Sequence, residues 1–175
     1  KGVKEDLEKL GALPEAELCR FRGIGEAKAI TLIAALELCY RRGLPMKGTS
    51  VEFGSSREVF ELMKRHFAGL KKEEFWIILL NRANKLIGQK QISVGGLSET
   101  IVDPKVIFPY VLENHAFSVI LAHNHPSGNV KPSKEDIAVT QKLCLSSAML
   151  DVTITDHMIF GGQHYFSFWD HEMMP

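Results

Sequence analysis

The sequence lacks a long apolar run, a disulfide framework and a net charge. Its longest apolar runs, "FWIILL" and "FSVILA", have the length of strands, well short of the roughly 18 residues that a membrane span needs. Its three cysteines are scattered and odd in number, which favours reduced thiols. No signal peptide is visible. We therefore expect a cytoplasmic protein without a membrane partner.

The net charge gives no evidence for a nucleic-acid partner, because 21 Lys and Arg residues balance 21 Asp and Glu residues. The 175 residues are 45% hydrophobic and 24% charged, which fits a globular protein able to build a core. This length predicts one ordinary domain, or a domain with a small satellite.

Hydrophobic periodicity divides the chain in two. Residues 5–42 have helical spacing, interrupted at "RGIGEAKA". The stretch 41–54 is rich in Gly, Pro, Ser and Thr and indicates a linker. We therefore predict an all-α module over residues 1–45 and a second domain over residues 49–172.

The second domain alternates helical and strand patterns, which predicts an α/β fold with a mixed sheet flanked by helices. Ser55 with Glu58 forms a capping box for a helix reaching about Phe67. Asp103 and Pro104 predict the start of another helix. The remaining expected elements are strands at 75–81, 86–96 and 117–122, a helix at 132–148, and short strands at "DVTIT", "HMIF" and "YFSF".

A candidate metal site follows the apolar strand 117–122. His123 and His125 extend that strand, and residues two apart in a strand point to the same face. Asp136 begins the next helix, which the intervening Pro-Ser-Gly loop can bring back toward the strand. Two His and one carboxylate form a three-ligand zinc site with one position open.

The spacing Ser133-x-x-Asp136 has a second interpretation. It matches a helix capping box, which by itself would explain both residues. From the residues alone, Asp136 can serve either as a cap or as a ligand.

The full spacing matches the JAMM metalloprotease motif at His123, His125, Ser133 and Asp136. The string "HNHPSG…PS..D" resembles the RadC family in particular, as do "LLNRANKLIG", "ISVGGLSETIVDPKVIF" and "TDHMIFGG". The resemblance covers about residues 49–169. It implies a JAMM/MPN fold, similar to that of cytidine deaminases. RadC proteins are commonly labelled DNA repair factors.

The resemblance also implies a mechanism. In the family, zinc is held at the positions of His123, His125 and Asp136, and an upstream glutamate contacts the zinc-bound water. "KKEEFW" offers Glu73 and Glu74; the family's usual Glu-x-Phe selects Glu73, and only strand parity can separate the two.

We expect roles for two further residues. Ser133 would donate a hydrogen bond to the developing oxyanion. His157, in "TDHMIF", is expected to have a structural hydrogen-bonding role. The implied reaction is zinc-dependent hydrolysis of an amide or isopeptide bond in an unknown peptide or protein substrate.

The N-terminal "FRGIGEAKA" resembles the helix-hairpin-helix element that precedes the domain in RadC proteins. Gly23 and Gly25 would permit a tight turn, and the following helix and Lys28 could meet a DNA phosphate without reading sequence. The alternative is a hairpin that only packs against its neighbour.

Three functions therefore remain open from the sequence. The first is a zinc metallopeptidase. The second is a DNA-binding, repair-associated protein with a vestigial or structural metal site, and the third is a metal-dependent nuclease that uses the same site. The sequence fixes neither the substrate nor the oligomeric state.

Overall fold

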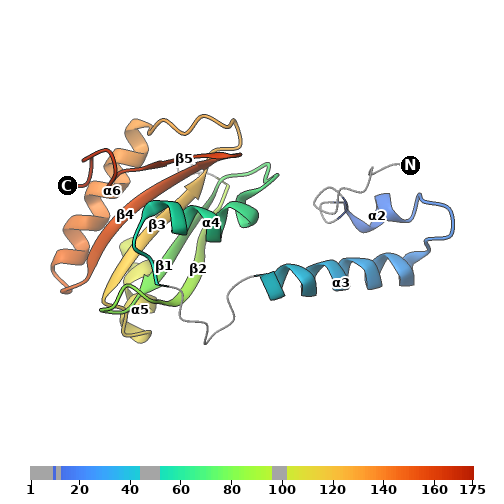
Figure 1. The fold of residues 1–175 in the computed structure, drawn as a ribbon, viewed down its shortest axis with the longest axis horizontal. Coiled ribbons are helices and arrows are strands. Elements are labelled where there is room, and N and C mark those ends of the chain that lie inside the picture. Colours follow the sequence, from blue (N-terminus) through green and yellow to red (C-terminus); the bar gives the residue numbers. More distant parts are fainter. Residues whose placement is uncertain (1–9, 11–12, 44–51, 96–101) are drawn as a thin grey trace. The chain divides into compact units, whose positions relative to one another are not determined.

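The computed structural model describes residue 10 and residues 13–43, 52–95 and 102–175. The chain forms two compact units, Lys1–Gly48 and Thr49–Pro175, drawn as ribbons in Figure 1. The predicted domain boundary lies outside the described residues, as does most of the predicted linker. Each unit is described by itself below.

The first unit contains helix α2 (Glu15–Leu18) and helix α3 (Glu26–Gly43). The break expected at "RGIGEAKA" is present as the turn before α3, which begins within that string at Glu26. Gly23 has φ +86°, a left-handed conformation that L side chains rarely adopt, so this position requires glycine. Leu18 and Ala29 are buried within the described part of this unit. The helix-hairpin-helix assignment remains a prediction.

The second unit is built on a five-stranded sheet of order β2-β1-β3-β4-β5. Only β3 and β4 pair in parallel; the other neighbours are antiparallel. A parallel pair needs a crossover connection, and helix α6 provides it. The predicted mixed sheet with flanking helices is confirmed. The strands are β1 (Glu74–Leu80), β2 (Leu86–Val94), β3 (Ser118–Asn124), β4 (Thr153–Gly161) and β5 (His164–Ser167).

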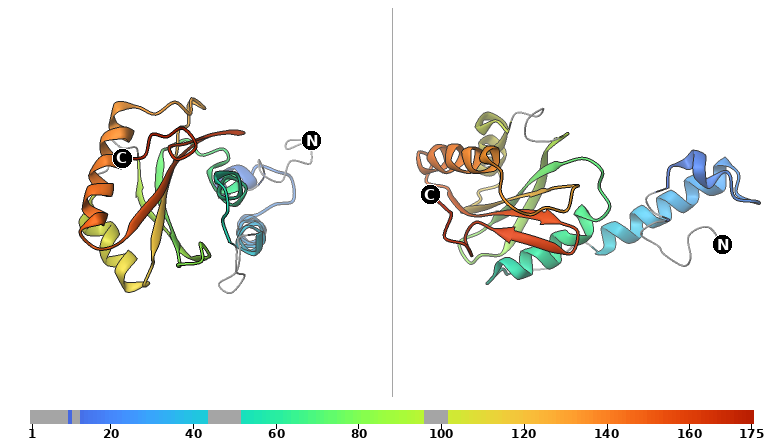
Figure 2. Two further views of the ribbon diagram at one scale, coloured as in Figure 1. Left: turned by 60° about the vertical axis from the view of Figure 1, so that its left-hand side comes forward. Right: turned by 90° about the horizontal axis from the view of Figure 1, so that it is seen from above.

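Helices cover both faces of this sheet, as Figure 2 shows. Helices α5 (Pro104–Glu113) and α6 (Lys134–Ala148) pack on one face, where Ile107 and Leu143 join a core with Ile77 and Leu121. Helix α4 (Ser56–Phe67) packs on the other face. Burying each large apolar side chain contributes about 1.5–3 kcal/mol. Strands β1 and β3 are therefore apolar on both faces, and each reads as a continuous apolar run.

The predicted helix starts are present. Helix α4 begins with the Ser55–Glu58 capping box. Helix α5 has Pro104 in its first turn, and its N-cap Asp103 accepts a hydrogen bond of 2.9 Å from the Lys105 N–H. In the described part of the chain, no helix is both long and apolar enough to cross a membrane.

One strand prediction was wrong. "DVTIT" and "HMIF" were expected as two short strands, but β4 runs without a break from Thr153 to Gly161. The apparent interruption is Asp156, a buried carboxylate inside the strand. It accepts hydrogen bonds from the Ser167 hydroxyl at 2.6 Å and the Trp169 N–H at 3.0 Å. These partners are distant in sequence, so the local pattern contains no sign of them.

Candidate metal centre

The two histidines after the apolar strand converge. His123 lies in β3, and the His125 N–H donates to the Phe160 carbonyl at 2.8 Å, so pairing with β4 continues past the end of β3. Both rings therefore point to the same side of the sheet. Their Nε2 atoms lie 3.0 Å apart.

Asp136, in the first turn of α6, completes the group. Its Oδ1 lies 3.1 Å from His123 Nε2, and its Oδ2 lies 3.5 Å from His125 Nε2. One ligand atom from each of the three residues lies within 4.8 Å of the others. The loop has brought helix and strand together as the spacing predicted.

The two oxygens of Asp136 have different surroundings. Oδ2 accepts hydrogen bonds of 2.7 Å from both the N–H and the hydroxyl of Ser133, and the Asp136 N–H donates back to the Ser133 hydroxyl oxygen at 3.1 Å. Oδ1 is buried, and among the described residues it has no partner in hydrogen-bond geometry. The capping interpretation and the ligand interpretation are therefore compatible, because each uses a different oxygen.

Burial and mutual contact shift the pKa of each of the three groups. Burial lowers the pKa of His123, despite the opposing effect of Asp136. Contact with Asp136 raises the pKa of His125. Burial alone would raise the pKa of Asp136, but its contacts with His123 and His125 hold that pKa well below the usual range. Two imidazoles and one carboxylate are the N and O donors that zinc accepts, so these residues fit the ion.

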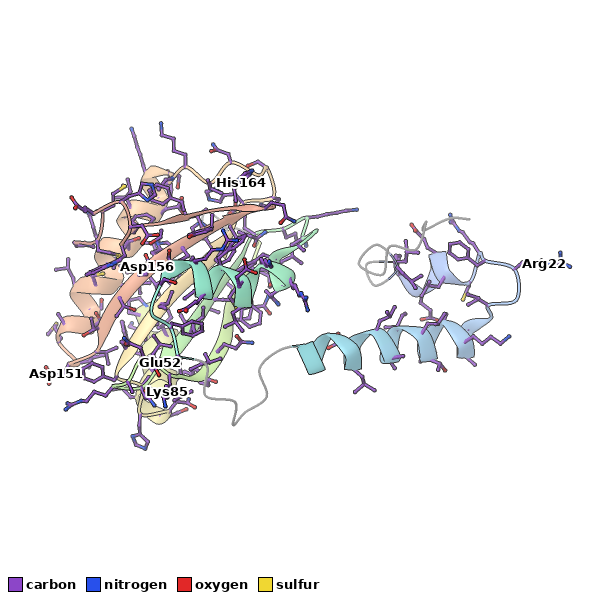
Figure 3. All side chains as sticks on the ribbon, viewed as in Figure 1. Arg22, Glu52, Lys85, Asp151, Asp156 and His164 are labelled. Atoms are coloured by element: carbon purple, nitrogen blue, oxygen red, sulfur yellow. The ribbon has the colours of Figure 1, made fainter. Side chains whose placement is uncertain are left out.

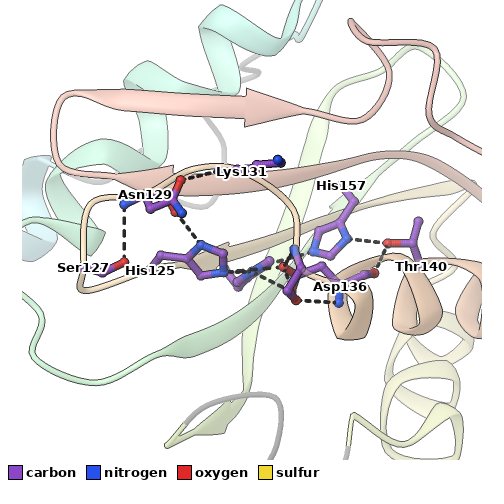
Figure 4. A network of polar contacts seen from close by, with 9 residues as sticks. His125, Ser127, Asn129, Lys131, Asp136, Thr140 and His157 are labelled. Atoms are coloured by element: carbon purple, nitrogen blue, oxygen red, sulfur yellow. Dashed lines mark hydrogen bonds and ion pairs between the residues drawn. The ribbon is translucent and has the colours of Figure 1, made fainter.

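A loop holds His125 in place, as Figure 4 shows. The Nδ1 atom of His125 lies 2.6 Å from the Asn129 carbonyl oxygen. A carbonyl can only accept, so Nδ1 carries the hydrogen, and in the neutral ring the Nε2 lone pair faces the site. The loop packs closely against β4 at Gly161. A Cβ atom at this position would lie only 2.5 Å from the Gly128 carbonyl oxygen, so the contact requires glycine. No pattern in the sequence indicated this close approach.

Strand parity separates the two candidate glutamates. Phe75 pairs with His123 across β1 and β3, and their rings stack with centroids 6.0 Å apart. Glu73 is two residues from Phe75, and the Gly95 N–H continues the β2 pairing to the Glu73 carbonyl at 2.8 Å. Glu73 therefore belongs to the face of the histidines. Its charge contributes to raising the pKa of His125.

Glu74 points to the opposite face of the sheet. Its Oε2 accepts a hydrogen bond of 2.9 Å from the Trp76 indole N–H and lies 3.0 Å from the Nε2 of His66 on α4. The side chain is therefore engaged in a separate polar cluster.

Two polar residues behind the site contact it through His123. His157 Nε2 lies 2.8 Å from His123 Nδ1, and the Thr140 hydroxyl oxygen lies 2.7 Å from His157 Nδ1. The hydrogen-bonding role expected of His157 is thus present in the structure. Thr140 was missed by sequence reasoning, although its position one turn after Asp136 on a helix was a usable signal.

Of the candidate DNA-binding residues, Gly23 and Gly25 lie on the turn before α3, and Lys28 lies in the first turn of α3. The Lys28 ammonium donates to the Gly23 carbonyl at 2.9 Å, so it closes the turn. Gly25 does not adopt a left-handed conformation. Arg22 is exposed on the same turn (Figure 3). DNA binding by this segment remains a prediction.

Comparison with known proteins identifies the family. The family model described as RadC-like JAB domain matches residues 53–173. The chain belongs to the RadC family. It is 41% identical over 166 residues to a UPF0758 protein of Flavobacterium johnsoniae, covering 95% of this chain and 72% of the relative.

Further relatives carry the same UPF0758 name. A UPF0758 protein of Geotalea uraniireducens is 38% identical over 168 residues, covering 96% of this chain and 74% of the relative. One of Rubrobacter xylanophilus is 40% identical over 158 residues, covering 90% and 69%. These names state no reaction and therefore leave the substrate open. Membership of the family with a RadC-like JAB domain supports a metal-dependent hydrolase.

Proposed function

We propose that this RadC-family chain is a zinc-dependent hydrolase that cleaves an amide bond, in a linear peptide or in an isopeptide. One observation carries the proposal. The Nε2 atoms of His123 and His125 lie 3.0 Å apart beside a buried Asp136 oxygen that has no hydrogen-bond partner among the described residues. Three such protein ligands leave one position free, as in catalytic rather than structural zinc sites.

Zinc and the nearby glutamate would divide the chemistry between them. Bound zinc would act as a Lewis acid that lowers the pKa of water. Glu73 would accept a proton from the attacking water and pass it to the leaving amine. Its place on the face of the histidines supports this role over the same role for Glu74.

Ser133 stabilises the negative charge that develops on the substrate carbonyl oxygen. Its hydroxyl has one hydrogen, which is donated to Asp136 Oδ2 in this structure. Rotation of the hydroxyl toward substrate leaves Oδ2 with the Ser133 N–H as partner, at 2.7 Å. The carboxylate therefore stays hydrogen-bonded when the serine acts.

A pair of matched variants tests the proposal. The zinc-loaded parent, Glu73→Gln and Glu74→Gln are incubated with a peptide library and, in parallel, with linear and branched DNA. The parent should cleave peptides, and Glu73→Gln should lose cleavage at unchanged zinc content. Glu74→Gln, the same change on the opposite face, should retain most activity.

Other outcomes contradict specific parts. Cleavage of DNA without cleavage of peptides would favour the nuclease over the peptidase. Loss of activity in Glu74→Gln but not in Glu73→Gln would move the proton carrier by one residue. A zinc-loaded parent that cleaves neither substrate would oppose the proposal as a whole.

A further inference from the structure

A series of hydrogen bonds runs from the backbone of α6 to Nδ1 of His123, on the edge of the ring that faces away from the site. The Thr140 hydroxyl donates to the Asp136 carbonyl oxygen at 2.6 Å. The same hydroxyl oxygen lies 2.7 Å from His157 Nδ1, and His157 Nε2 lies 2.8 Å from His123 Nδ1. The series begins and ends on candidate ligands, since both Asp136 and His123 belong to the metal centre.

The number of hydrogens on each group assigns the donor of each hydrogen bond in this series. A threonine hydroxyl has one hydrogen, and the Asp136 carbonyl takes it. The Thr140 oxygen can therefore only accept from His157, so His157 Nδ1 carries a hydrogen. The neutral His157 ring then has a lone pair on Nε2, which accepts from His123 Nδ1. In the neutral His123 ring this leaves Nε2 as a lone pair facing the site.

The surroundings hold both rings in place. His157 is 0% exposed and His123 is 1% exposed. Phe168 stacks on the His157 ring with centroids 4.9 Å apart, and Phe75 contacts its edge at 5.7 Å. A buried hydrogen-bond network whose groups are all satisfied fixes the orientation of its side chains.

We infer that Thr140 and His157 are positioning residues that fix the tautomer and orientation of His123 for zinc. Outer-shell partners of this kind typically change metal affinity by about 10- to 100-fold when they are removed. The same threonine also holds the Asp136 carbonyl, so one hydroxyl supports two of the three ligands. The inference rests on the proposed zinc site, but the tautomers can be measured without zinc.

The first experiment reads the tautomers directly. Long-range proton–nitrogen NMR spectra of the zinc-free parent at pH 8 report which nitrogen of each histidine carries hydrogen. His123 and His157 should both be protonated at Nδ1 and bare at Nε2. The Nε2-protonated tautomer of either ring would overturn the inference, whether or not the protein binds zinc.

The second experiment measures zinc affinity by chelator competition in four proteins. Thr140→Val removes the hydroxyl at nearly constant shape, Thr140→Ser restores it, and His157→Phe keeps an aromatic ring but removes both nitrogens. Thr140→Val and His157→Phe should bind zinc about 10-fold or more weakly. Thr140→Ser should bind like the parent. Thermal unfolding confirms that each variant is folded.

The outcomes separate this inference from the proposed function. A parent that binds no zinc opposes the proposed function. The tautomer measurement still tests the inference about Thr140 and His157 in that case. Parent-like affinity in both Thr140→Val and His157→Phe would overturn the inference while leaving the zinc site intact. Equal weakening in Thr140→Ser and Thr140→Val would attribute the effect to packing, which also overturns it.

Discussion

Helices α4 and α6 begin with the same local device in different surroundings. Each has a serine followed three residues later by an acid, Ser55 with Glu58 and Ser133 with Asp136. The Glu58 carboxylate accepts from the N–H groups of Gly54 at 2.6 Å and Ser55 at 3.2 Å, and the residue is exposed. Asp136 is fully buried and caps its helix through Oδ2.

The difference lies in the second oxygen. A capping carboxylate needs only one oxygen for the backbone amides. At exposed Glu58, water can hydrate the other one. At Asp136 the other oxygen is buried 3.1 Å from His123 Nε2. A capping box thus becomes part of a metal centre when the tertiary structure encloses its spare oxygen beside other ligands.

Removing the acid from each box should produce the largest contrast. Asp136→Ala deletes a ligand and a buried cap, so we expect loss of most bound zinc, as also for His125→Ala. Elemental analysis of protein purified without added metal measures this, with one zinc per chain expected in the parent. Full zinc retention in either variant would remove that residue from the site.

Gly161→Ala should lower the zinc affinity and the stability of the protein without changing either capping box. Its Cβ would lie 2.5 Å from the Gly128 carbonyl oxygen and displace the loop that positions His125. Overpacking of this kind costs about 1–3 kcal/mol. Thermal unfolding and chelator competition should both record a loss. Gly162→Ala is not a suitable control, because Gly162 has φ +62° and would be strained for another reason.

The pH dependence of the zinc-free protein should also depend on Asp136. Its folded pKa is depressed below the ordinary 3.8, so its stabilising contribution is present above that value and is lost as pH falls. This loss should begin below about pH 5. Thermal midpoints of the parent should therefore fall more steeply between pH 5 and pH 3 than those of Asp136→Asn. Parallel curves would contradict the assigned interactions.

The smallest effect is expected at α4. Glu58→Ala removes an exposed capping carboxylate and should lower the free energy of unfolding by about 0.5–1 kcal/mol. Zinc content should be unchanged, because the site lies on the other face of the sheet. A loss of zinc comparable to that of Asp136→Ala would mean that both substitutions act through global stability.

The sequence predicted the elements that depend on local patterns. The apolar strands and the caps at Ser55 and Asp103 were predicted correctly, because periodicity and capping are local properties. The convergence of His123 and His125 followed from strand alternation.

Features that depend on distant partners could not be predicted. Asp156 interrupted an apolar pattern, and its hydrogen-bond partners follow it by 11 and 13 positions. The choice between Glu73 and Glu74 needed the register of β1 against β3. The series of hydrogen bonds from Thr140 to His123 requires α6 to lie over β4, and no local pattern encodes this arrangement.

The central claim is that His123, His125 and Asp136 bind one zinc ion. The most direct test is an anomalous difference map recorded at the zinc edge from crystals of the zinc-loaded protein. The account predicts one peak per chain, about 2.0–2.2 Å from both histidine Nε2 atoms and from Asp136 Oδ1. A zinc peak bound elsewhere, with none between these three residues, would contradict it.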